Sequence, residues 1–159
     1  MDTVMKWQPT QEKEAERQLI KDFAEKRGYE VIKLQGDEDD GKTDGVIGRD
    51  GKQISVEARR KGYPNHKGKD CTFMSGWETE FLVREGIFLN ERTIRNYESK
   101  KFLFIVDIKG PKGSEPRACR IDQTRVAELL KQPHKKMKST NSHVWQSVKY
   151  VPVSWFIPY

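Results

Sequence analysis

The chain opens with a segment whose apolar residues recur at helical spacing. Thr10 is a good helix cap, and Gly28 is a typical residue for a helix end. Between them, the apolar residues that share one helix face are Leu19, Ile20 and Phe23. The pattern therefore predicts a helix that begins after Thr10 and ends at Gly28.

One acidic residue has an unusual position on this predicted helix. Glu16 precedes the three apolar residues by three, four and seven positions, so it lies on or beside the face that should be buried. A buried carboxylate costs free energy unless it has a partner. Two interpretations follow: Glu16 belongs to a functional site, or it lies at the edge of the face and reaches water.

Alternation of apolar and polar residues predicts the next elements. Residues 29–34 form one such strand, and two further strands flank Asp50-Gly51, a strong signal for a hairpin turn. Along the second strand of this hairpin, side chains point to opposite faces in turn. Ile54, Val56 and Ala58 share the apolar face, and Ser55, Glu57 and Arg59 share the other, which Lys61 joins if the strand continues.

The second half of the chain contains a continuous apolar run and several shorter elements. Residues 102–106 are apolar throughout, as expected of a strand buried on both faces. Asn90 is a good cap for a helix over 90–99, and Pro152 favours an edge position for the last strand, 150–156. The remaining expectations are a strand at 118–121, a helix at 123–130, and loops at 110–116 and 131–138.

Strands that alternate with helices predict an α/β sandwich around a mixed sheet. A length of 159 residues suits one domain over 1–159, with a motif-bearing core at about 10–61, a basic loop at 62–75 and further core at 90–157. The composition, 35% hydrophobic and 34% charged, is typical of a folded soluble protein.

Charge and cysteine content narrow the function classes. The 30 basic and 24 acidic residues give a net charge of +6, which suits a polyanionic partner such as nucleic acid. Cys71, Cys119 and the three histidines lack the spacing of a structural zinc site. No apolar run is long enough to span a bilayer, and the first residues contain no hydrophobic signal segment. We therefore expect an intracellular, cytoplasmic protein without a membrane partner.

The predicted hairpin carries residue types that can hold a divalent metal against a phosphate. Asp44 opens its first strand, and Glu57 lies on its second, two residues before Arg59. Mg²⁺ prefers hard oxygen ligands, which two carboxylates and the carbonyl of Ala58 can supply. A bound metal activates water for phosphodiester hydrolysis, and a neighbouring cation stabilises the developing charge. The alternative is an ordinary hairpin with an exposed Glu57–Arg59 pair, which contributes little to stability.

Four short segments resemble the motifs of the PD-(D/E)xK nuclease superfamily. They are AERQL at 15–19, GYEV at 28–31, TDGV at 43–46 and SVEAR at 55–59. Their layout is similar to that of archaeal-type Holliday-junction resolvases and small restriction-like nucleases. The resemblance implies a restriction-endonuclease-like three-layer sandwich, in which helices flank a central mixed β-sheet. It also implies a Mg²⁺ site, at which Mn²⁺ substitutes, held by Glu16, Asp44, Glu57 and Ala58.

One departure from the motif concerns its lysine, which is Arg59 in this chain. A buried lysine can lose its proton, whereas arginine effectively cannot. We expect a Mg²⁺-dependent DNA endonuclease in which Asp44 and Glu57 hold the metal and Arg59 stabilises the phosphate, with Lys61 as a second catalytic cation. Two alternatives stay open: a catalytically weak or inactive DNA-binding protein of the same fold, and an interaction protein that binds no nucleic acid.

Basic residues around the predicted site are candidates for contacts with phosphates, which give affinity without sequence readout. They are Arg60, Lys61, Lys67, Lys69, Lys100 and Lys101. These residues predict a DNA partner. Because one site cuts one strand, we also expect a homodimer for cleavage of a duplex.

Overall fold

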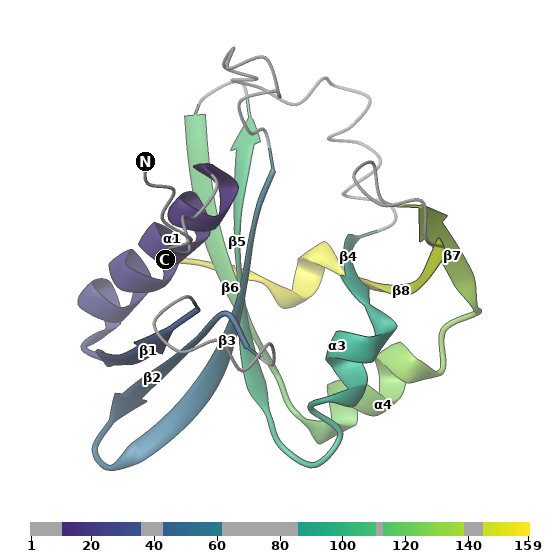
Figure 1. Ribbon diagram of the computed structural model, residues 1–159, viewed down its shortest axis with the longest axis horizontal. Coiled ribbons are helices and arrows are strands. Elements are labelled where there is room, and N and C mark those ends of the chain that lie inside the picture. Colours follow the sequence, from purple (N-terminus) through teal and green to yellow (C-terminus); the bar gives the residue numbers. More distant parts are fainter. Residues whose placement is uncertain (1–10, 36–42, 62–85, 111–112, 139–144) are drawn as a thin grey trace, which may run out of the picture.

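The computed structural model describes residues 11–35, 43–61, 86–110, 113–138 and 145–159. Its centre is a six-stranded mixed sheet with the strand order β1-β2-β3-β5-β6-β9, and a smaller sheet has the order β4-β8-β7 (Figure 1). Neighbouring strands of the central sheet are antiparallel, except for β3 and β5, which are parallel. The predicted α/β class with a mixed central sheet is confirmed.

The helices and strands have the following bounds. The central sheet contains β1 (Glu30–Leu34), β2 (Gly45–Arg49), β3 (Lys52–Lys61), β5 (Phe102–Gly110), β6 (Gly113–Ile121) and β9 (Ile157–Pro158). The smaller sheet contains β4 (Ile87–Asn90), β7 (Lys135–Lys138) and β8 (Trp145–Val151). The described helices are α1 (Gln11–Arg27), α3 (Glu91–Arg95), α4 (Gln123–Leu130) and the 3₁₀ helix η1 (Val153–Trp155).

Two apolar clusters hold these elements together on opposite sides of β5. α1 lies on one side of the central sheet, and α3, α4 and the smaller sheet lie on the other (Figure 1). Leu103 and Ile105 belong to the cluster that contains α1, whereas Phe102, Phe104 and Val106 belong to the cluster that contains α3 and α4. The alternation along β5 confirms the prediction of a strand buried on both faces.

Two local signals in the sequence act as predicted. Gly28, with φ of 73°, follows the last turn of α1, and the Tyr29 N–H closes the helix end by donating to the carbonyl of Ala24 at 2.8 Å. Asp50 and Gly51 both have positive φ, 54° and 75°, as the tight turn between β2 and β3 requires. The predicted helix cap Thr10 lies outside the described residues.

Several predictions for the second half of the chain are wrong. Residues 113–116 belong to β6 and not to a loop. The strand tolerates Pro116 because β9 pairs only with Arg117 and Ala118, which leaves one side of β6 open at the proline. Residues 135–138 form β7, an edge strand whose lysines discourage pairing with other chains. Pro152 ends β8 rather than marking a sheet edge, since β8 is the middle strand of the smaller sheet.

The predicted helix over 90–99 is shorter in the structure. The Asn90 side chain caps α3 as expected, accepting from the Arg92 N–H at 3.0 Å, but the regular helix ends at Arg95 and continues as turns. The predicted basic loop at 62–75 lies outside the described residues. Among the helices that the structure describes, none is long and apolar enough to cross a membrane.

Candidate functional site

Asp44 directly precedes β2, and a backbone hydrogen bond holds it beside β3. Its N–H donates to the carbonyl of Val56 at 3.2 Å. The next residue has to be small, since a Cβ on Gly45 would lie 3.1 Å from both Cδ1 of Ile20 and the carbonyl oxygen of Lys33. The Asp44-Gly45 pair therefore lets α1 pack closely against the start of β2 while the carboxylate lies next to β3.

The Asp44 and Glu57 side chains meet from adjacent strands. Gly45 pairs with Val56, so the next residues outward, Asp44 and Glu57, oppose each other. Both are buried, with 8% and 4% of their surface exposed. Burial, followed by the neighbouring Asp44 carboxylate, raises the pKa of Glu57 to about 9. Glu57 therefore keeps its proton at neutral pH in the absence of a further cation.

Arg59 is bound to this pair through one nitrogen atom. Its Nη1 donates to Asp44 Oδ2 at 2.9 Å and to the carbonyl oxygen of Ala58 at 2.7 Å. The same Asp44 oxygen accepts from the Ala58 N–H at 2.9 Å. Burial lowers the pKa of Arg59, but the carboxylates of Asp44, Glu57 and Glu16 raise it by more, so the guanidinium stays charged. The prediction of an exposed Glu57–Arg59 pair is wrong, because Glu57 is buried and Arg59 pairs with Asp44.

Glu16 is buried on α1, with 7% of its surface exposed, so the interpretation that it reaches water at the edge of the helix face is wrong. Its carboxylate raises the pKa of Arg59, which places it within electrostatic reach of the guanidinium. Within the described segments, no three Asp, Glu, His or Cys side chains form a group that could hold a metal ion. The structure thus brings Asp44 and Glu57 together and leaves Glu16 near Arg59, outside a three-acid group.

Tyr97 is a residue of this site that the sequence did not reveal. Its hydroxyl donates to Glu57 Oε1 at 3.2 Å, and its ring stacks on Phe102 with 4.1 Å between the centroids. Burial and the nearby Glu57 raise the pKa of Tyr97, so its hydroxyl remains a donor at neutral pH. A tyrosine after a short helix is typical of a core position, so only its contact with β3 identifies this role.

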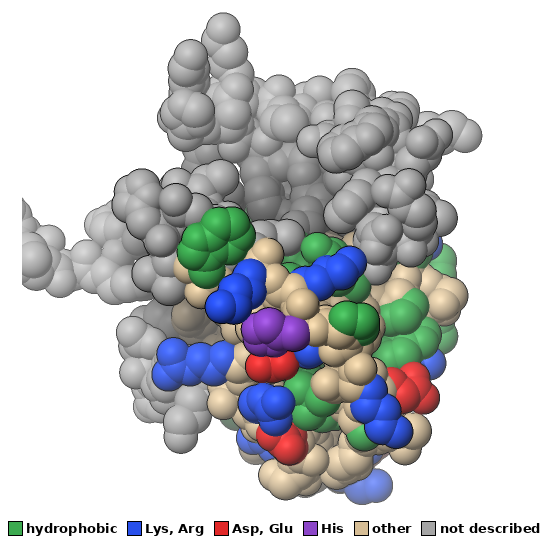
Figure 2. Space-filling model, turned by 90° about the vertical axis from the view of Figure 1, so that its right-hand side faces the viewer, with side chains coloured by type: hydrophobic (Ala, Val, Ile, Leu, Met, Phe, Trp, Pro, Cys, Tyr) green, Lys and Arg blue, Asp and Glu red, His purple; other side chains and the backbone are tan. Residues whose placement is uncertain are grey.

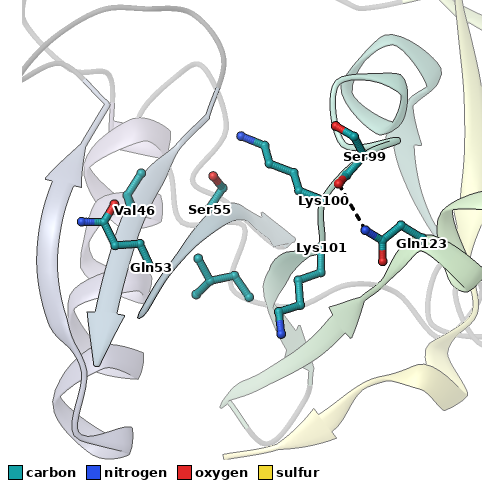
Figure 3. A pocket seen from close by; sticks show the side chains of 8 residues that line it. Val46, Gln53, Ser55, Ser99, Lys100, Lys101 and Gln123 are labelled. Carbon is teal, nitrogen blue, oxygen red and sulfur yellow. Dashed lines mark hydrogen bonds between the residues drawn. The ribbon is translucent and has the colours of Figure 1, made fainter. Parts of the chain in front are cut away.

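A groove of about 660 Å³ opens between the β2-β3 hairpin and the turn that precedes β5 (Figure 3). Lys100 and Lys101, two of the predicted DNA contacts, line it and extend in different directions (Figure 3). The three acids are not among its lining residues, but Ser55 is, two positions before Glu57 on β3. The Lys100 ammonium lies 5.8 Å from the centroid of the Tyr97 ring, which connects this wall to the acid site. The other lining residues are Val46, Gln53, Ile54, Ser99 and Gln123.

A second groove of about 300 Å³ continues from the first, sharing Gln53, Ile54 and Lys101. The residues that it adds are Tyr29, Arg49, Asp50, Lys52 and Arg120. Cations therefore outnumber acids along both grooves. By contrast, basic side chains on the face that carries α3, α4 and the smaller sheet are scattered and separated by polar, apolar and acidic ones (Figure 2).

Of the other predicted DNA contacts, the structure describes only the backbone of two, Arg60 and Lys61. Arg60 and Lys61 belong to β3, but their side chains lie outside the described part of the molecule. Lys67 and Lys69 lie outside the described residues altogether.

No protein-family model, curated protein or solved structure matches this chain.

Proposed function

We propose that this protein is a Mg²⁺-dependent endonuclease that hydrolyses phosphodiester bonds in DNA. One observation carries the proposal: two hard oxygens, Asp44 Oδ2 and Ala58 O, converge on a single cationic nitrogen, and the Glu57 carboxyl lies beside them. Buried carboxylates that repel one another are unfavourable in a purely structural hairpin. A function that requires a bound cation gives this arrangement a reason.

The donor set fits a magnesium ion. Its members are carboxylate and carbonyl oxygens, the ligands that Mg²⁺ prefers, and two of them already bind a positive group. Burial, followed by the Asp44 carboxylate, raises the pKa of Glu57, and a divalent ion bound here would favour the ionised carboxylate. Asp44, Glu57 and Ala58 would hold the ion, and Glu16 would add negative potential through its position near Arg59. When bound, Mg²⁺ supplies a water of lowered pKa and offsets charge on the phosphodiester.

The residues around the donors have separate tasks in this proposal. Arg59, once free of Asp44, presents a planar guanidinium that suits a phosphate. Tyr97 fixes the Glu57 carboxyl through its hydroxyl, and Lys100 attracts the phosphate backbone along the groove. Lys61, at the end of β3, remains the second candidate cation.

The arrangement of elements supports a place in the PD-(D/E)xK superfamily with a restriction-endonuclease-like sandwich. α1 carries the first acid, the β2-β3 hairpin carries the second and third, and helices lie on both sides of the mixed sheet (Figure 1). The cationic grooves, one of which reaches the acid site through Lys100 beside the Tyr97 ring, support a DNA partner. Two copies of the chain would be needed to cut both strands, so the proposal includes a homodimer, which light scattering in solution tests.

The direct test is nicking of supercoiled plasmid and cleavage of branched DNA with Mg²⁺ or Mn²⁺. The wild-type protein should cut, and Asp44→Asn and Glu57→Gln should each lower the rate by at least about 100-fold, the usual scale for loss of a group that stabilises transition-state charge. Glu25→Gln is a matched control, because it removes an acid from an exposed position on α1 that lines neither groove. Equal cleavage by wild type and Asp44→Asn refutes the site.

A binding assay separates the proposal from its two alternatives. Gel shifts with and without metal, repeated across a salt series, measure DNA affinity independently of cleavage. Tight, salt-sensitive binding without metal-dependent nicking identifies an inactive DNA-binding protein. Absence of salt-sensitive binding to DNA or RNA identifies an interaction protein without a nucleic-acid partner.

A further inference from the structure

Arg59 contacts the same oxygen atoms that the proposed metal requires. One nitrogen, Nη1, bonds both Asp44 Oδ2 at 2.9 Å and Ala58 O at 2.7 Å. Glu57 and Glu16 add negative potential around the guanidinium. The arginine is thus bound as a counter-ion to the donor set, and it does not extend away from it.

Occupation of shared ligands makes two cations compete. A guanidinium and a divalent ion cannot both take the Asp44 Oδ2 and Ala58 O positions, and their like charges repel in a site with little water. The Arg59 guanidinium can move toward solvent, since 28% of the side chain is exposed. Its long, flexible stem lets the charged group leave while the backbone of β3 stays in place.

We infer that Arg59 is a built-in occupant of the cation position, so that metal binding and release of the guanidinium from Asp44 are one coupled exchange. The inference rests on the proposed function, because it assigns the metal to the same oxygens. It explains why the chain carries arginine at this position: the side chain neutralises Asp44 before the metal arrives and becomes available for an anion afterwards. The exchange also means that Arg59 lowers the affinity of the site for the metal, because the guanidinium has to leave the shared oxygens first.

The coupling predicts changes of opposite sign in two measurements. Replacing Arg59 by glutamine removes the competitor and its charge, so the affinity for Mn²⁺ should rise by about tenfold or more, while DNA nicking falls. Arg59→Lys keeps the charge but loses the planar group that bonds both oxygens, so its affinity should lie between those of wild type and Arg59→Gln. Arg27→Gln removes an equal charge from the exposed end of α1 and should bind Mn²⁺ like wild type.

The experiment measures Mn²⁺ alone, without DNA, by electron paramagnetic resonance of the free ion in titrations of the full chain. Circular dichroism melts confirm that each variant is folded, and Arg59→Lys serves if Arg59→Gln does not fold. In the wild type, nitrogen-15 NMR of arginine side chains should show one guanidinium signal shift on addition of Mg²⁺, and Arg59→Lys should lack that signal.

Each result has a distinct meaning. Tighter Mn²⁺ binding by Arg59→Gln together with an unchanged Arg27→Gln supports the exchange. Equal Mn²⁺ affinity in wild type and both Arg59 variants overturns the exchange, although the proposed nuclease site survives. If neither wild type nor the Arg59 variants bind Mn²⁺, the exchange and the metal site fail together, and the nicking assay then shows whether any nuclease function remains.

Discussion

The buried proton on Glu57 makes a quantitative prediction about stability. The folded protein raises the Glu57 pKa from its ordinary 4.5 to about 9, mainly by burial and then by the Asp44 carboxylate. Between these values the folded state holds a proton that the unfolded state has lost, so stability must fall as pH rises. The slope for one proton is about 1.4 kcal/mol per pH unit. From pH 5.5 to pH 7.5, this group alone should cost the wild type about 3 kcal/mol of unfolding free energy.

Glu57→Gln removes the titration while keeping the size of the side chain and an oxygen that can accept from the Tyr97 hydroxyl. The variant should therefore lack this loss. The difference in unfolding free energy between variant and wild type should shift in favour of the variant by about 3 kcal/mol across the two pH units. Urea unfolding followed by the fluorescence of the 4 tryptophans, in the presence of a chelator, measures both proteins. The comparison cancels the titration of all other groups.

Glu25→Gln is the matched control, because it makes the same substitution at an exposed position on α1. Parallel curves for wild type and Glu57→Gln between pH 5.5 and 7.5 would refute the reasoning. They would mean that Glu57 holds no extra proton in the folded state, and that the close carboxyl pair with Asp44 does not exist in solution.

Three further predictions follow from other parts of the structure. Tyr97→Phe should lower stability at pH 7 by about 1 kcal/mol in urea. Because the Tyr97 hydroxyl lowers the Glu57 pKa, its removal raises that pKa further, so the fall of stability with rising pH should extend to a higher pH than in the wild type; an unchanged pH profile contradicts this contact. Replacing Lys100 and Lys101 together by alanine should reduce the slope of log K against log salt for binding to duplex DNA by about 0.9 per lost phosphate contact. Fluorescence anisotropy measures this slope, and a slope equal to that of the wild type would exclude Lys100 and Lys101 as DNA contacts. Gly86→Ala should lower the stability of the fold by about 2 kcal/mol or more. Gly86 has φ of 98°, and a Cβ there would lie 2.4 Å from a backbone oxygen of β8; a melting temperature equal to that of the wild type would contradict the prediction.

Local signals in the sequence predicted the part of the fold that carries the acids. Asp50-Gly51 sets the hairpin turn, Gly28 ends α1, and the alternation along residues 54–59 separates the core face from the polar face. These signals act within a few residues of one another, so they can be recognised without knowledge of the rest of the chain. They also indicated that Asp44 and Glu57 belong together.

The misses come from interactions between distant segments. Pro116 looked like a loop residue, and only the short pairing of β9 with β6 explains why it is tolerated in a strand. Tyr97 has no motif around it, and its contact with Glu57 depends on the packing of the turn after α3 against Phe102 of β5, the neighbour of β3. The ion-pair partner of Arg59 was also missed. The sequence suggests Glu57, which is two residues away on the same strand, whereas Arg59 pairs with Asp44 across the hairpin.

The parallel pairing of β3 with β5 has a consequence for synthesis on the ribosome. β3 is complete at Lys61, but its neighbour begins only at Phe102, so a nascent chain must present an unprotected strand edge until the intervening residues have emerged. A premature stop near residue 61 would yield both carboxylates without Tyr97 and without the strand that covers this edge. Such a fragment should associate with other chains through the open edge instead of forming a small functional unit.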